Sequence, residues 1–217
     1  MKYQPKNKEE LKALCDDQTV NLGDIDTSKI TDMSELFRDS QRTNEQFAGI
    51  ETWDVSNVTN MASMFRFARH FNQPLNDWDV SNVTNMVGMF NYATYFNQPL
   101  NDWDVSNVSD MSGMFAYAKS FNQPIGNWDV SKVFDMTEMF REANNFNQPL
   151  KSWNVSNVTN MDAMFLGAKN FNQFIGCWDV SKVENMSDMF ARSKFNQALD
   201  SWDVSNVKGM SFMFHCY

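Results

Sequence analysis

Residues 103–127 read WDVSNVSDMSGMFAYAKSFNQPIGN, and this stretch recurs along the chain with few changes. A tryptophan opens each copy, at Trp53, Trp78, Trp103, Trp128, Trp153, Trp178 and Trp202. Successive tryptophans are 25 residues apart five times and then 24. A fixed period of about 20–50 residues is typical of proteins in which similar units stack one on another. The sequence therefore predicts one continuous array of coils.

Each unit combines two patterns, numbered here from its tryptophan as position 0. Positions 8, 11, 12 and 15 are Met, Met, Phe and Ala in the quoted copy, a spacing that predicts a helix of about two turns. The segment around residues 128–130 is rich in β-forming residues and follows an Asn-Gln-Pro corner, so we expect a short strand there. We predict an α/β repeat fold, a right-handed solenoid with one short parallel strand and one short helix per 25-residue coil.

The chain is expected to have two parts. Residues 1–24 form an N-terminal helical cap, because Asn7 and Glu10 have the spacing of a helix capping box. Residues 25–217 form a solenoid of one degenerate, six near-complete and one truncated repeat, and the degenerate unit carries three extra residues before Trp53. The last coil is less well protected than the first, so we expect it to permit self-association through edge pairing.

The recurring apolar positions are expected to form inward-facing columns, in which each side chain packs on its copies in the neighbouring coils. Removing one of them, for example by Trp128→Ala, is expected to cost about 3–5 kcal/mol.

Two polar columns are expected to satisfy backbone groups. One has an Asp after each tryptophan except at Asn154; a single carboxylate per coil is too sparse for calcium, so we expect it to cap turns. The other has Asn followed by Gln, and we expect a hydrogen-bond ladder at the corners. Its asparagines are Asn72, Asn97, Asn122, Asn147, Asn172 and Asn196.

Composition excludes several classes of function. Lys and Arg number 18 against 27 Asp and Glu in 217 residues, a net charge of −9, which argues against nucleic acid as a partner. No apolar run approaches the roughly 20 residues of a membrane-spanning helix, so no membrane insertion is expected. Cys15, Cys177 and Cys216 share no motif spacing, so neither a disulfide framework nor a zinc site is expected. We expect no cofactor and no metal.

The unit WDVSNVTNM-x-x-MF-x-x-A-x-x-FNQPL resembles the 25-residue repeat of the BspA-like leucine-rich-repeat surface proteins, which also occurs in mycoplasma-type surface lipoproteins. The resemblance covers about residues 25–217. It implies a leucine-rich-repeat-like solenoid in a bacterial protein, with a role in adhesion or host contact, and it carries no catalytic residues to transfer. It also implies a cell-surface or secreted location. The first ten residues show no secretory signal, which by itself favours the cytoplasm.

Binding residues are expected among the positions that vary between copies. Position 14 is aromatic in three successive coils, and three further residues lie beside it at the rim of the predicted helix. The candidate set is Phe67, Tyr92 and Tyr117 with Arg66, His70 and Tyr95. The alternative is that these rings only seal the groove between helices.

Catalysis has little support, because neither His70 nor His215 has a positioned nucleophile in a motif around it. We therefore expect a non-enzymatic binding module for a protein or glycan partner, host-derived in an adhesion role. An intracellular protein–protein interaction scaffold is the main alternative, and a glycan hydrolase is a weaker one.

Overall fold

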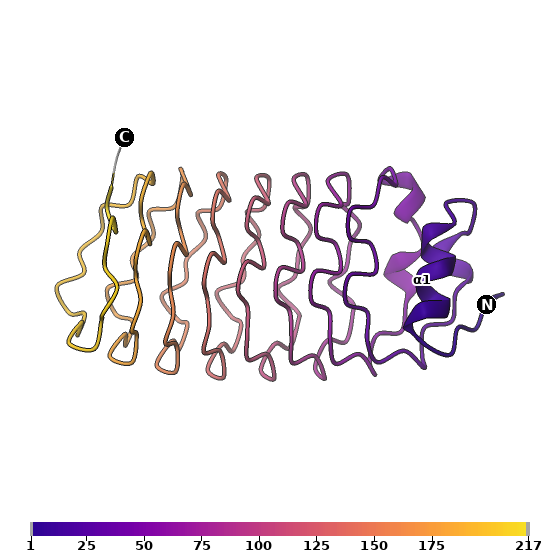
Figure 1. Cartoon of the computed structure of the whole chain (residues 1–217), viewed down its shortest axis with the longest axis horizontal. Coiled ribbons are helices and arrows are strands. Elements are labelled where there is room, and N and C mark those ends of the chain that lie inside the picture. Colours follow the sequence, from indigo (N-terminus) through magenta and orange to yellow (C-terminus); the bar gives the residue numbers. More distant parts are fainter. Residues whose placement is uncertain (1, 216–217) are drawn as a thin grey trace.

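The computed structural model describes residues 2–215, and in it the chain winds into flattened coils that stack along one axis (Figure 1). One α-helix, α1 (Lys8–Asp16), lies at the N-terminal end of the stack. Three short 3-10 helices follow it in the first part of the chain: η1 (Leu22–Asp24), η2 (Glu45–Phe47) and η3 (Ile50–Thr52). From residue 53 to residue 215 the chain consists of turns, extended segments and isolated bridges.

The predicted helix in each coil is wrong, because consecutive turns occupy its place. In the third tryptophan coil, Met114 N–H donates to the Met111 carbonyl at 3.2 Å, and Ala118 N–H donates to the Phe115 carbonyl at 3.0 Å. The third residue of each four-residue turn has a positive φ, which is 61° at Gly113 and 59° at Tyr117. A turn with positive φ at its third residue sends side chains inward at nearly the same spacing as a helix.

Alternate N–H groups of the turn segment bond to the next coil instead of along a helix. Met111 donates to Asp135 at 3.1 Å, Gly113 to Thr137 at 2.7 Å, and the same pairing repeats along the segment. Neighbouring coils therefore satisfy the backbone groups that a two-turn helix would have to satisfy alone, and such a helix is too short to be stable by itself.

The predicted strand is also wrong in position and extent. Among residues 2–215, parallel pairing consists of single bridges: one joins Tyr3 to Ile25, and the others lie at position 7 of the repeat unit. The bridges at position 7 form one continuous series along the stack, through Asp32, Asn60, Asn85, Asp110, Asp135, Asn160, Asn185 and Gly209. The segment around Trp128 is held differently, since its indole N–H donates to the Leu100 carbonyl of the preceding coil at 3.0 Å. The right-handed, leucine-rich-repeat-like class stays a prediction.

The inward columns predicted from the repeat are present. Trp128 is 3 % exposed, and the methionines and phenylalanines at the recurring inward positions of the central coils are fully buried. The phenylalanines form two columns of nearly parallel rings; Phe115 lies 4.0 Å from Phe121 in its own coil and 5.7 Å from Phe140 in the next. Stacking of identical side chains thus builds a single core that runs the length of the array.

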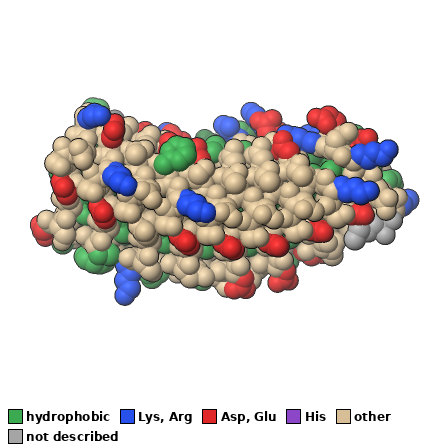
Figure 2. Space-filling model, turned by 90° about the horizontal axis from the view of Figure 1, so that it is seen from below, with side chains coloured by type: hydrophobic (Ala, Val, Ile, Leu, Met, Phe, Trp, Pro, Cys, Tyr) green, Lys and Arg blue, Asp and Glu red, His purple; other side chains and the backbone are tan. Residues whose placement is uncertain are grey.

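Both polar columns satisfy backbone groups as expected. The Asp129 carboxylate accepts the Ser131 N–H at 3.0 Å, and Asn154 accepts the Ser156 N–H in the same way at 3.2 Å. The Asn122 side chain accepts the Asn147 N–H of the next coil at 2.9 Å. On the face seen in Figure 2, acidic side chains recur along the stack on a surface that is mostly polar and uncharged.

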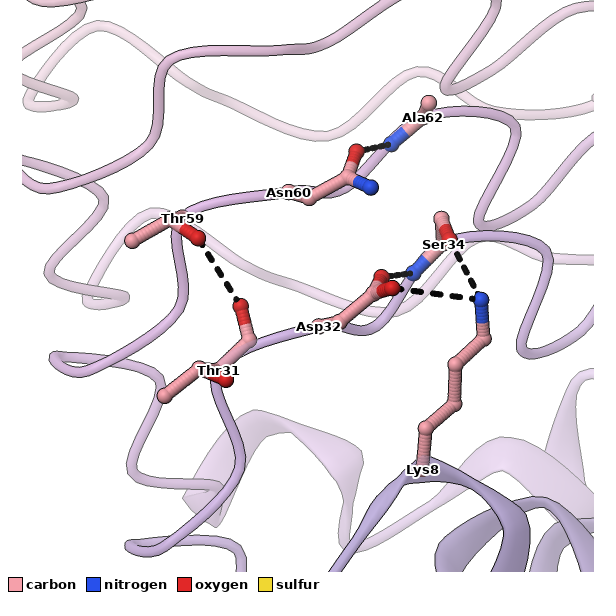
Figure 3. A network of polar contacts seen from close by, with 7 residues as sticks. All are labelled: Lys8, Thr31, Asp32, Ser34, Thr59, Asn60 and Ala62. Carbon is pink, nitrogen blue, oxygen red and sulfur yellow. Dashed lines mark hydrogen bonds and ion pairs between the residues drawn. The ribbon is translucent and has the colours of Figure 1, made fainter.

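The helix expected after Asn7 is present as α1 and covers the first coil. The Asn7 side chain accepts the Glu10 N–H at 2.9 Å, while Glu10 accepts the Lys6 N–H at 2.8 Å. Lys8 reaches from α1 to Ser34 at 2.5 Å and Asp32 at 3.5 Å, at the start of the bridge series (Figure 3). Within residues 2–215 no coil precedes this one, and α1 supplies partners at this end of the stack.

Candidate functional site: a hollow beside the first coil

A surface hollow of about 400 Å³ lies between the first coil and the two coils that follow it. Its lining residues are Gln41, Thr43, Asn44, Glu45, His70, Asn72 and Tyr95. A second hollow of about 290 Å³ adjoins it, shares Gln41 and His70, and extends past Phe67 and Arg69. Together the two hollows include three residues of the predicted binding set, Phe67, His70 and Tyr95.

The three extra residues of the first unit build one wall of this hollow. Asn44 holds the place of Asn72 in the amide ladder, because its side chain accepts the Asn72 N–H at 2.9 Å. Ile50 holds the place of Leu75, because both carbonyls accept a tryptophan indole N–H. Ile50 follows Asn44 by six positions, whereas Leu75 follows Asn72 by three, so the insertion falls where η2 forms.

Arg42 leaves the hollow open by turning into the protein. It is 1 % exposed, and its guanidinium donates to the carbonyls of Cys15 (3.0 Å), Asp17 (2.8 Å) and Gln46 (2.8 Å). The next residue at this position of the repeat is His70, which is exposed. Arg42 therefore does not lie beside His70 on the outer surface. It connects the end of α1 to the inserted segment instead.

The rings at position 14 form a closed stack. Phe67 lies 4.7 Å from Tyr92, and Tyr92 lies 4.1 Å from Tyr117 with an interplanar angle of 10°. Guanidinium groups lie over both end rings, since Arg66 is 5.2 Å from the centre of Phe67 and Arg141 is 5.6 Å from that of Tyr117. Neighbouring groups thus cover the ring faces, which supports the sealing role that the sequence left as an alternative.

A second pair of rings is more open. Tyr95 is 58 % exposed and stacks on His70 at 5.9 Å with an interplanar angle of 20°. The equivalent position in the following coil holds the small residue Ser120. Of the six predicted residues, His70 and Tyr95 line the larger hollow and Phe67 lines the smaller one, whereas Arg66, Tyr92 and Tyr117 lie on the closed stack.

The electrostatics of the site are mildly acidic. The pKa of Glu45 is held below its usual range by its own backbone N–H and by the Thr43 side chain, so its carboxylate is ionised at neutral pH. On the closed stack, burial and then the hydroxyl of Tyr117 raise the pKa of Tyr92. The exposed side chain of Gln41 is anchored by donating to the Asp39 carbonyl at 3.0 Å.

Farther along the same outward face the side chains are charged and pair with one another. Arg141 pairs with Glu138, and Glu142 extends over Gly167 to Arg192 at 3.5 Å. Gly167 suits this contact, because its φ is 68° and an added Cβ would lie 2.6 Å from the Glu142 carboxylate, which would then have to move. Asp162 lies in this group with a pKa raised by burial and then by Asp188.

The cysteines, the potential metal-ligating side chains and the helices bear on the remaining predictions. Cys15 is buried, which raises its thiol pKa to about 12, and Cys177 is exposed, with its sulfur 3.3 Å from the Lys151 carbonyl. Cys216 lies outside the described residues. Within residues 2–215 there is no cluster of three potential metal-ligating side chains, and no helix is long and apolar enough to cross a membrane.

Comparison with protein families matches residues 9–125 and 119–216 to the family described as "Mycoplasma protein of unknown function, DUF285". The chain belongs to the DUF285 family. The two matched segments span nearly the whole array and begin within α1, so this DUF285 chain is a bacterial repeat protein throughout. No curated protein and no solved structure matches it.

Gln41, Thr43 and Glu45 of this DUF285 chain were missed by the sequence analysis. The only signal for them was the length of the first unit, which showed an insertion without showing where it fell. Arg42 gave no signal at all, because an arginine at a position otherwise occupied by exposed polar or aromatic residues is expected to face solvent.

Proposed function

We propose that the chain is a non-enzymatic binding module of the bacterial surface-adhesion type, which recognises a protein or glycan partner, host-derived in an adhesion role. We further propose that its repeat is of the BspA-like leucine-rich-repeat kind. The observation that supports binding is the hollow formed by the insertion, the inward turn of Arg42 and the exposed Tyr95. Hollows of about 300–1,000 Å³ with a few fixed polar groups are typical ligand sites.

The scaffold behind the hollow suits such a role. Its wall residues are anchored by backbone bonds, as in the donation from the Gln73 side chain to the Asn44 carbonyl at 2.6 Å. A preorganised surface loses little conformational entropy on binding. The acidic net charge of −9 disfavours nucleic acid and anionic membranes as partners.

Binding is tested on arrays of extracellular-matrix proteins and glycans with the wild type, Tyr95→Ser and the double variant Tyr92→Ser/Tyr117→Ser. All three must share a folded circular-dichroism spectrum. We expect the wild type to bind and Tyr95→Ser to lose binding, while the double variant keeps binding after allowance for its lower melting temperature. Loss only in the double variant would move the site to the closed stack.

Location separates an adhesin from an intracellular scaffold. Protease treatment of intact cells that carry the natural protein should cleave an adhesin and spare a cytoplasmic scaffold. Protection from protease, together with no binding by folded wild type on the arrays, would overturn the proposal.

A further inference from the structure

We infer that the hollow binds the end of an uncharged glycan, with one sugar ring packed on the His70 ring face and hydrogen-bonded by Gln41 and Glu45. This inference rests on the proposed function and names its ligand class. It depends on an open ring face, on the chemistry of the opposite wall and on the local charge.

The open ring face follows from the pairing of aromatic side chains along the stack. Tyr95 covers one face of His70 at 5.9 Å. The other face points along the stack toward the first coil, where Arg42 turns into the protein to bond backbone carbonyls. The polarised C–H groups on one face of a sugar ring are attracted by the electron-rich face of an aromatic ring. By contrast, each ring of the closed stack is already covered by a ring or a guanidinium.

The opposite wall carries the groups that sugar hydroxyls require. A hydroxyl both donates and accepts, so it pairs well with a carboxylate or an amide oxygen held in one place. Glu45 is held by its own N–H and by Thr43, and Gln41 is held through its amide nitrogen. Both side chains are therefore anchored at one point before any ligand arrives.

The charge of the lining selects against acidic sugars. Among the described residues that line the larger hollow, Glu45 alone carries a formal charge when histidine is neutral. A sialic acid or uronate placed there would meet a carboxylate of like charge within an acidic molecule. A cationic partner such as an arginine-rich peptide would instead gain from that carboxylate, and it serves as the competing ligand in the test.

The experiment is isothermal titration of the full chain with uncharged oligosaccharides of galactose, glucose and N-acetylhexosamines, each beside its sialylated counterpart and beside an arginine-rich peptide. We expect an uncharged oligosaccharide to bind and its sialylated form to bind about tenfold more weakly. His70→Ala should weaken binding of the uncharged form at least about tenfold, whereas Tyr92→Ser, a ring of the closed stack, should change it less than about twofold. Glu45→Gln keeps the shape of the side chain and should restore binding of the sialylated form.

Three results would overturn the inference. If uncharged sugars bind His70→Ala and Glu45→Gln as well as they bind the wild type, the glycan site lies elsewhere. Array binding of a matrix protein that is lost in Tyr95→Ser, with no oligosaccharide bound, would retain the proposed function and remove the glycan. Binding of the arginine-rich peptide alone would make the hollow a site for basic partners.

Discussion

At the scale of single residues, two positions of the repeat hold their backbone in the left-handed region. Positions 10 and 14 have positive φ wherever they fall within residues 25–215, and twelve of these residues are not glycine. Such a conformation costs a residue with a Cβ roughly 1–2 kcal/mol. The stack tolerates this cost because these turns direct alternate N–H groups to the next coil.

Ala163→Gly is therefore expected to stabilise the protein. Ala163 has φ 52° at position 10, where other coils place Gly88 and Gly113. Relief of the left-handed conformation should exceed the loss of one buried methyl, so we expect the free energy of unfolding in urea to rise by about 0.5–1 kcal/mol. Ala62→Gly is the control, since Ala62 lies one position earlier without a positive φ and its change should destabilise by about 0.5–1 kcal/mol. Equal destabilisation by both changes would contradict the argument.

Asp162→Asn is expected to stabilise the protein at neutral pH. Burial and then Asp188 raise the pKa of Asp162, so the folded protein holds this proton more tightly than the unfolded chain does. Stability attributable to this group is therefore lost as the pH rises through the interval between the unfolded and the raised folded pKa. The variant should unfold at higher urea concentration than the wild type at pH 7, and at the same concentration near pH 3.

Asp179→Asn is the matched comparison for that titration. The Ser181 side chain and backbone N–H lower the pKa of Asp179, so its contribution is present above the unfolded pKa and lost as the pH falls. This variant should match or fall below wild-type stability at pH 7 and lose less stability on acidification. A pH dependence of the same sign for Asp162→Asn and Asp179→Asn would show that the local environments do not control these groups.

At the scale of structural elements, the sequence predicted which side chains face inward but not the backbone that carries them. Met111, Met114, Phe115 and Ala118 point into the core as expected, yet consecutive turns place them there. A helix and this series of turns share nearly the same inward spacing, so periodicity alone does not separate them. The N–H groups of Gly113 and Tyr117 decide the outcome, because a neighbouring coil offers them carbonyls that a sequence pattern does not display.

The candidate site was likewise predicted only in part: the sequence shows the residue types but not the contacts between coils. His70 and Tyr95 were predicted as binding residues because their types are visible in the sequence. Their separation from Tyr92 and Tyr117 depends on which ring faces are covered, and that depends on stacking between coils. The inward turn of Arg42 depends on free carbonyls at the end of α1, which become apparent only in three dimensions.

Trp128→Ala is expected to destabilise the array much more than Trp202→Ala. Trp128 is 3 % exposed and packs against Trp103 on one side and its own core on the other, so its removal should cost about 3–5 kcal/mol. Trp202 is only half-buried, with no described coil beyond its own. Urea unfolding followed by tryptophan fluorescence measures both variants. Equal costs would mean that the core does not extend evenly through the central coils.

At the scale of the whole molecule, the two ends of the described stack differ. The α1 helix covers the first coil, whereas Val204, Met210 and Phe212 in the last coil are 41 %, 44 % and 64 % exposed. The backbone N–H groups of earlier coils bond forward to the next one. An apolar edge of this kind is a site at which a second copy can pair.

Self-association through the last coil is therefore expected. Because one end is covered, contact through the other gives a closed pair with two-fold symmetry, not a filament. Sedimentation velocity should show a concentration-dependent dimer for the wild type that Met210→Ser/Phe212→Ser converts to monomer. Added salt should favour the dimer by screening the net charge of −9. A monomer at all concentrations, or a dimer unchanged by the double variant, would contradict this prediction.

The regular spacing of the coils determines how far the hollow lies from the other end of the array. The hollow is built by the first three coils alone, while the later coils repeat the same contacts with their neighbours. Gain or loss of one 25-residue unit beyond residue 128 would leave the hollow unchanged and would lengthen or shorten the rod by about 4.8 Å. The number of repeats would then set the distance between the hollow and whatever the other end of the array is attached to. In-frame duplication of repeats would change that distance in equal steps.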